Sequence, residues 1–176
     1  GMANKNRLIK TFMDLVQIDS QTGEEDAMDQ EVSNRLEALG FSVYHDSFKN
    51  VIANLSGIGD PIVLSAHLDT VEPGRGIKPI LDGDILRSDG TTILGGDCKS
   101  GVTIVLEALE TVIEAHQDHV PIEVAFSRAE EGGLVGAGCS GGGFSATVIG
   151  VLSGPLGRAA LTLCDLSARP LSPPAR

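Results

Sequence analysis

The chain has 176 residues, 41% of them hydrophobic, and a formal net charge of −11. Its length and hydrophobic content predict one packed globular domain and argue against a disordered chain. The acidic charge argues against nucleic acid and anionic membranes as partners, because both require a basic face. No apolar run approaches the roughly 18 residues of a membrane span. We therefore look for the function in a small number of chemically distinctive motifs.

Three segments carry apolar residues at the intervals typical of amphipathic helices. In chain order they are residues 6–18, 25–39 and 100–116. Between and after them lie shorter apolar runs that predict strands, at residues 41–45, 51–55, 61–66, 121–126, 147–152 and 159–164. The run at residues 80–86 is interrupted by Asp-Gly-Asp and predicts a hairpin. Helices that alternate with apolar strands indicate a layered α/β domain.

The cysteines and the N-terminus bear on the compartment. Cys98, Cys139 and Cys164 are odd in number and lack CxxC spacing, which indicates free thiols in a reducing environment. No basic segment followed by an apolar one begins the chain, so we expect no secretory signal. Both features favour a cytoplasmic protein.

The composition changes after Glu131. Residues 1–131 hold 23 of the 24 acids and 10 of the 13 Lys and Arg residues, for a net charge of −13. Residues 132–176 hold one acid, three arginines, 10 of the 22 glycines and 4 of the 8 prolines. This segment is therefore atypical of the chain that precedes it.

His67 and Asp69 follow the strand predicted at residues 61–66. Alternate residues of a strand point the same way, so these two side chains can act together at its carboxyl end. A metal-bound imidazole usually donates its other N–H to a carboxylate, which fixes the tautomer. Taken alone, the pair also fits a surface histidine beside a capping aspartate.

Asp97 lies between a glycine pair and the helix predicted at residues 100–116. Glycine lets the backbone turn tightly and approach a ligand closely, and a carboxylate at such a point can bridge two cations. The glycine-rich segment at residues 94–101 lacks GxxxxGK[ST] spacing, and an acid at its centre would repel phosphate. A phosphate-binding loop is therefore disfavoured. A simple turn with a helix cap remains the alternative for this motif alone.

Glu130 and Glu131 follow the strand predicted at residues 121–126. Neighbouring like charges at the end of a buried strand cost energy unless a cation offsets them. One carboxylate can ligate a metal while the other accepts a proton from metal-bound water. An imidazole with carboxylates suits zinc, cobalt or manganese. A solvated acidic turn is the alternative if the pair is considered alone.

Residues 5–137 resemble the dinuclear zinc exopeptidases of the M20 family, and among them peptidase T and its tripeptidase-like relatives. Three strings carry the resemblance, in register along the chain: SAHLDTV at 65–71, ILGGDCKSG at 93–101 and AEEGGLVGA at 129–137. The resemblance implies a three-layer α/β catalytic domain with a mixed central sheet. It also implies two zinc ions and a short peptide as substrate.

The resemblance also implies a role for each motif residue. His67, Asp97 and Glu131 are expected to ligate the metal ions, with Asp97 bridging them. Asp69 is expected to orient His67, and Glu130 to act as the general base. In such enzymes the peptide bond after the bridging aspartate is often cis, so the Asp97–Cys98 bond is a candidate.

The chain departs from the family pattern after Glu131. The family has a further carboxylate in a strand whose counterpart here is residues 150–155, with Ser153 near the position of the acid. It then has a lid or dimerisation domain and a last histidine ligand, whereas here no histidine follows Glu131 and Asp165 is the only acid. We therefore expect an apparently truncated catalytic domain. Its N-terminal part would be residues 1–137, its atypical C-terminal segment residues 138–176, and its lid domain absent.

Three functions fit these motifs. The first is a tripeptidase-like metallo-aminopeptidase, which releases N-terminal residues from short peptides. The second is an amidohydrolase of the same family that acts on N-acyl amino acids. The third is a non-catalytic fragment that binds metal weakly, or that self-associates through an unfinished sheet edge, because unpaired edges invite pairing.

Overall fold

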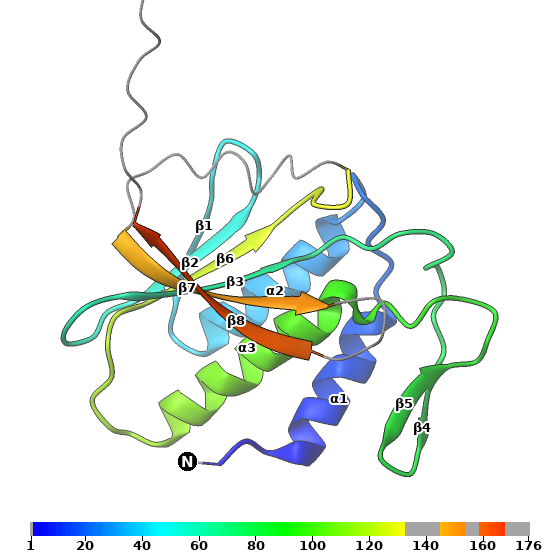
Figure 1. The fold of residues 1–176 in the computed structure, drawn as a ribbon, viewed down its shortest axis with the longest axis horizontal. Helices are drawn as coiled ribbons and strands as arrows, with labels where there is room; N and C mark the ends of the chain where they lie inside the picture. The colour runs from blue at the N-terminus through cyan, green and yellow to red at the C-terminus, as the bar shows by residue number, and fades with distance from the viewer. Residues whose placement is uncertain (1, 133–144, 154–158, 168–176) are drawn as a thin grey trace, which may run out of the picture.

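A six-stranded mixed sheet forms the centre of the structure, a computed structural model that describes residues 2–132, 145–153 and 159–167 (Figure 1). The strand order across the sheet is β1-β2-β6-β3-β7-β8. The strands are β1 (Ser42–His45), β2 (Val51–Leu55), β3 (Ile62–His67), β6 (Ile122–Ser127), β7 (Ser145–Ser153) and β8 (Ala159–Ser167). A separate hairpin pairs β4 (Pro79–Asp82) with β5 (Ile85–Ser88).

Strand direction decides which residues meet at the edge of the sheet. β3 is parallel to both of its neighbours, β6 and β7, while the remaining pairs are antiparallel. His67 at the end of β3 is in register with Ser127 at the end of β6. The segments that leave these two strands therefore start side by side.

Three helices pack on one side of the sheet, as Figure 1 shows: α1 (Lys5–Val16), α2 (Asp26–Ala38) and α3 (Gly96–Glu114). Asn4 caps α1, because its side chain accepts a hydrogen bond from the backbone N–H of Arg7 at 3.1 Å. After α2 the chain turns at Gly40, whose φ of +90° is easily adopted only by glycine.

The core lies between the helices and one face of the sheet. Alternate residues of β6 point into it, because side chains of a strand alternate between faces. They meet the apolar stripes of α2 and α3 in one cluster of buried side chains, which includes Met28, Val32, Leu36, Val102, Val105, Leu106, Leu109, Ile122, Val124 and Phe126. Burial of this apolar surface fixes the position of α3, whose first turn reaches the end of β3.

The predicted α/β class with a mixed central sheet is confirmed, and each predicted helix and strand has its counterpart. The segment at residues 138–176 supplies β7 and β8, which extend the same sheet beside β3. Among the described residues, no helix is both long and apolar enough to cross a membrane. The side chain of Cys98 is buried, whereas Cys139 lies outside the described residues.

Candidate metal centre

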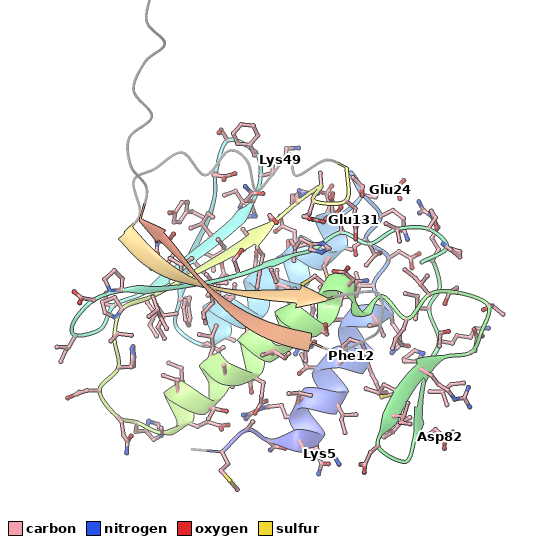
Figure 2. All side chains as sticks on the ribbon, in the orientation of Figure 1. Lys5, Phe12, Glu24, Lys49, Asp82 and Glu131 are labelled. Atoms are coloured by element: carbon pink, nitrogen blue, oxygen red, sulfur yellow. The ribbon has the colours of Figure 1, made fainter. Side chains whose placement is uncertain are left out.

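The residues singled out in the sequence gather where β3, β6 and α3 meet. His67 is the last residue of β3, Asp97 lies in the first turn of α3, and Glu130 and Glu131 follow β6. Figure 2 shows Glu131 beyond the end of the sheet, at the opposite end of the molecule from Lys5. Three segments that are far apart in the sequence therefore bring their polar side chains to one place.

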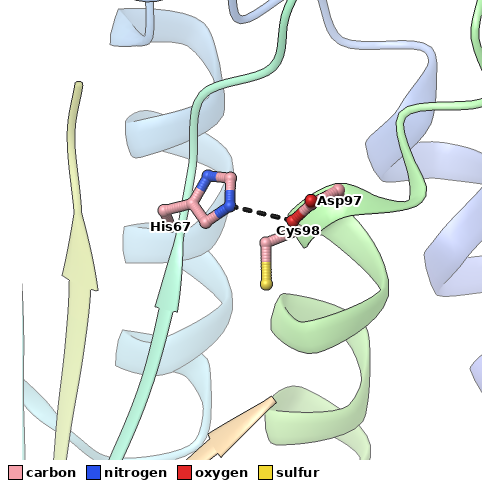
Figure 3. Close-up of side chains that lie close together, drawn as sticks. All are labelled: His67, Asp97 and Cys98. Carbon is pink, nitrogen blue, oxygen red and sulfur yellow. Dashed lines mark hydrogen bonds and ion pairs between the residues drawn. The ribbon is translucent and has the colours of Figure 1, made fainter. Parts of the chain in front are cut away.

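The His67 ring uses its two nitrogens differently. Nδ1 lies 2.9 Å from the carbonyl oxygen of Asp69 and 3.3 Å from its carboxylate, so this nitrogen donates. Nε2 faces the other acids, at 3.1 Å from Asp97 Oδ1 (Figure 3) and 3.7 Å from Glu130 Oε2. The ring is therefore held from one side and presents Nε2 to the cluster of carboxylates.

Asp69 is fully buried, and its carboxylate joins several segments. Oδ1 accepts the backbone N–H of Glu130 at 2.9 Å, while Oδ2 accepts that of Glu131 at 3.0 Å and the hydroxyl of Thr22 at 2.8 Å. Burial alone would raise the pKa of Asp69, but these donors and His67 favour the charged form and lower it to about 2. Asp69 therefore connects the His67 strand to the Glu130–Glu131 turn.

Asp97 is brought to the site by a local break in helical geometry. Asp97 and Cys98 have non-helical backbone angles within α3, and the peptide bond between them is cis, as the family resemblance led us to expect. Gly95 precedes them with φ +74°, and a side chain there would lie 3.2 Å from the Ile77 Cδ1 atom. The carboxylate of Asp97 is 55% exposed and faces the His67 ring.

Like charges accumulate in the open part of the site. The pKa of Glu131 is raised, first by burial and then by the carboxylates of Asp97, Glu130 and Asp69, although His67 opposes this. Burial would lower the pKa of His67, but hydrogen bonds to Asp69 and Asp97 raise it to about 9. The arrangement thus favours a positive charge at its centre.

The positions of the donor atoms suit a metal ion. Among the described residues, two groups have ligand atoms within 4.8 Å of one another: His67 with Glu130 and Glu131, and His67 with Asp97 and Cys98. Cys98 fits the role less well, because burial raises the pKa of its thiol and a metal binds the thiolate. Imidazole and carboxylate donors then remain, the set that suits zinc, cobalt or manganese.

The register of β7 and β8 shows whether either strand could supply the further carboxylate that the family has after its glutamate pair. β7 ends at Ser153, which lies toward the same end of the sheet as His67, because β7 is parallel to β3. Asp165 pairs instead with Thr147, near the start of β7. Its backbone therefore lies toward the far end of the sheet from the cluster, which argues against Asp165 as a replacement ligand.

Two residues near the site were not assigned a function from the sequence. Thr22 lies in a polar segment between α1 and α2, yet its hydroxyl donates a hydrogen bond to Asp69. Lys99 is fully buried, its ammonium group donates to the carbonyl of Ile18, and burial lowers its pKa to about 8. Neither contact has a sequence signal, because each joins two segments that are far apart in the sequence and meet only in the folded structure.

Comparisons with known proteins place these features in context. The sequence profile of peptidase family M28 matches residues 50–139 of this chain. An uncharacterised protein of Bacillus subtilis, YqjE, is 37% identical over 146 residues, which cover 77% of this chain and 39% of that protein. The crystal structure of a Staphylococcus aureus tripeptidase matches with TM-score 0.76 and 34% identity over 85% of this chain and 44% of its own.

A second solved structure, the aminopeptidase PepT of Bacillus cereus, has the same TM-score of 0.76 and 38% identity. That match covers 79% of this chain and 40% of the PepT chain. This chain therefore spans less than half the length of these three relatives.

Proposed function

This chain belongs to peptidase family M28, and on that basis we propose that it carries the metal-binding part of a tripeptidase-like exopeptidase. Such an enzyme releases N-terminal residues from short peptides. The likeness to a tripeptidase and to PepT supports this substrate class over others with the same fold. It also supports the resemblance to the peptidase T group of the M20 family, which shares the zinc-exopeptidase fold with family M28.

The observation that carries the proposal is the position of His67 Nε2, which faces Asp97 and Glu130 while Nδ1 is held by Asp69. In the proposed site, His67, Asp97 and Glu131 would hold the metal. When bound, zinc would lower the pKa of a water molecule and polarise the substrate carbonyl.

Each other residue has a defined task in the reaction. Asp69 accepts a hydrogen bond from Nδ1–H of His67 and so leaves Nε2 as the ring nitrogen that faces the metal site. Glu130 is the general base. Its carboxylate accepts a proton from the attacking water and gives it to the nitrogen of the cleaved peptide bond, which becomes the amine of the remaining peptide. Its side chain is partly exposed, so water and a peptide can reach it.

The proposal is tested by peptide hydrolysis with zinc, cobalt or manganese added to metal-free protein. We expect release of the N-terminal residue from tripeptides, and loss of at least about 100-fold in kcat for Glu130→Gln with zinc stoichiometry unchanged. Glu37→Gln, an exposed acid of α2, is the matched control. Hydrolysis of N-acyl amino acids in place of tripeptides would instead favour the amidohydrolase function. Protein that binds no metal and cleaves neither substrate class would overturn the proposal.

A further inference from the structure

A second set of buried polar contacts joins the start of α2 to the turn that carries Glu130 and Glu131. Its centre is Glu25, which directly precedes α2 and is 1% exposed. One oxygen of its carboxylate accepts the backbone N–H of Ala129 at 2.9 Å. The other lies 3.3 Å and 3.4 Å from two guanidinium nitrogens of Arg128.

The turn needs this support because of its backbone conformation. Ala129 has φ +54°, in the left-handed region that is unfavourable for an L-residue with a Cβ atom. Ala129 directly precedes Glu130, so its conformation sets the direction in which the chain leaves β6. A contact that holds the Ala129 N–H therefore also fixes where the two carboxylates point.

Four successive backbone N–H groups in this turn are held by three buried side chains. That of Arg128 donates to Asn50 at 3.0 Å, that of Ala129 to Glu25, and the next two to Asp69. Asp69 and Asn50 follow or precede strands of the central sheet, whereas Glu25 comes from the helical layer. Glu25 is thus the one of the three that ties the turn to α2.

We propose that Glu25 is a positioning residue for the metal centre, which holds Ala129 in the left-handed conformation and thereby directs Glu130 and Glu131 toward His67. The part of this inference that concerns metal affinity rests on the proposed function. The part that concerns the turn stands on the contacts alone.

The chain supplies a matched control next to Glu25. Asp26 is also acidic and also pairs with Arg128, at 2.6 Å, but its side chain is 91% exposed. Its carboxylate accepts a hydrogen bond from the Arg128 guanidinium. Loss of Asp26 removes a charge from Arg128 and leaves the Ala129 N–H bonded to Glu25.

The first measurement is amide hydrogen exchange in metal-free protein, for Glu25→Ala, Glu25→Gln and Asp26→Ala. Glu25→Ala is expected to speed exchange at Ala129, Glu130 and Glu131 by at least about fivefold relative to the strand amides of β6, because the Ala129 N–H loses its acceptor. Glu25→Gln keeps an acceptor oxygen and should restore most of the protection. Asp26→Ala should leave it unchanged.

The second measurement is the zinc dissociation constant of the same variants. Removing a residue that orients metal ligands typically weakens metal affinity by 10–100-fold, and we expect this for Glu25→Ala but less than about twofold for Asp26→Ala. If Glu25→Ala does not fold, the test uses Glu25→Gln. We then expect a smaller loss of zinc affinity that still exceeds the loss in Asp26→Ala.

The outcomes separate this inference from the proposed function. Wild-type protein that binds no metal would overturn the proposed function, and the exchange data would still decide the role of Glu25. Unchanged exchange at Ala129, Glu130 and Glu131 in Glu25→Ala would overturn the positioning role. Equal loss of zinc affinity in Glu25→Ala and Asp26→Ala would also overturn it, because the effect would then come from charge alone.

Discussion

Asp69 and Asp97 lie on opposite sides of the same histidine, yet the chain treats them differently. Asp69 is fully buried and accepts hydrogen bonds from Thr22 and from the backbone of the Glu130–Glu131 turn. Asp97 is 55% exposed and faces His67 from the open side. One carboxylate is satisfied inside the fold, and the other is available to a ligand.

The difference separates two tasks that the sequence motifs present together. The buried part of the site, Asp69 with its donors, is stable without metal because each charge already has partners. The open part brings Asp97, Glu130 and Glu131 together, where like charges raise the pKa of Glu131. A bound cation would offset this repulsion, so metal binding should depend on the open part and folding on the buried part.

The largest effect is expected for Asp69→Ala. The change leaves two backbone N–H groups and the Thr22 hydroxyl without their acceptor, and it leaves the His67 ring only the backbone carbonyl of residue 69. We expect this to cost about 3–5 kcal/mol in the free energy of unfolding. Urea unfolding of metal-free protein measures this. Asp97→Ala is the matched control and should cost less than about 1 kcal/mol, because its side chain is largely solvated. Equal losses in the two variants would contradict the division of the site.

Zinc should stabilise the protein through the open part. Ligand at 100 times its dissociation constant adds about 2.7 kcal/mol to the free energy of unfolding. Thermal unfolding with and without zinc should therefore show a higher Tm that a chelator reverses. Asp97→Asn should abolish the increase, whereas Asp60→Asn, an exposed acid away from the site, should keep it. A rise in Tm that survives Asp97→Asn would place the zinc elsewhere.

Glu107 offers a buried carboxylate whose partner is a cation within the chain. It accepts hydrogen bonds from the Arg7 guanidinium at 2.7 Å and 2.9 Å, which lower its pKa from the ordinary value of 4.5. A carboxylate whose pKa is lower in the folded than in the unfolded chain stabilises the fold at pH values above its unfolded pKa. This contribution is lost as the pH falls below about 4.5.

Glu107→Gln should therefore cost about 2 kcal/mol at pH 7 and make the acid decline of stability shallower. The measurement is urea unfolding from pH 7 to pH 3. Glu114→Gln is the control, because that partner of Arg7 is 62% exposed and should change stability little. An acid decline in Glu107→Gln as steep as in the wild type would contradict the assignment.

The sequence predicted the elements of this fold well because their signals are local. Apolar periodicity marked α1, α2 and α3, and the short apolar runs marked the strands. The family resemblance also implied that His67, Asp97 and Glu130 would meet, and the structure brings them together.

Contacts that depend on three-dimensional packing could not be predicted in this way. The hydroxyl of Thr22 and the carboxylate of Glu25 look like ordinary turn and cap residues in the sequence. Each acts on a residue brought near only when α2 packs against the sheet, 47 positions away for Thr22 and 104 for Glu25. The orientation of the ligands is therefore set by residues outside the motifs that carry the ligands.

The smallest effect, and the sharpest test of the open part, is expected for Glu131→Gln. The pKa of Glu131 is raised by burial and by neighbouring carboxylates, so the folded state disfavours its charge at neutral pH. The variant should make metal-free protein more stable at pH 7 by at most about 0.5 kcal/mol, because solvent screens this exposed group, and should have no effect well below pH 4. With saturating zinc the sign should reverse, since a ligand is lost. Chemical unfolding of both variants with zinc and with chelator measures the reversal, and a variant that is destabilised equally in both conditions would assign Glu131 to the fold and not to the metal.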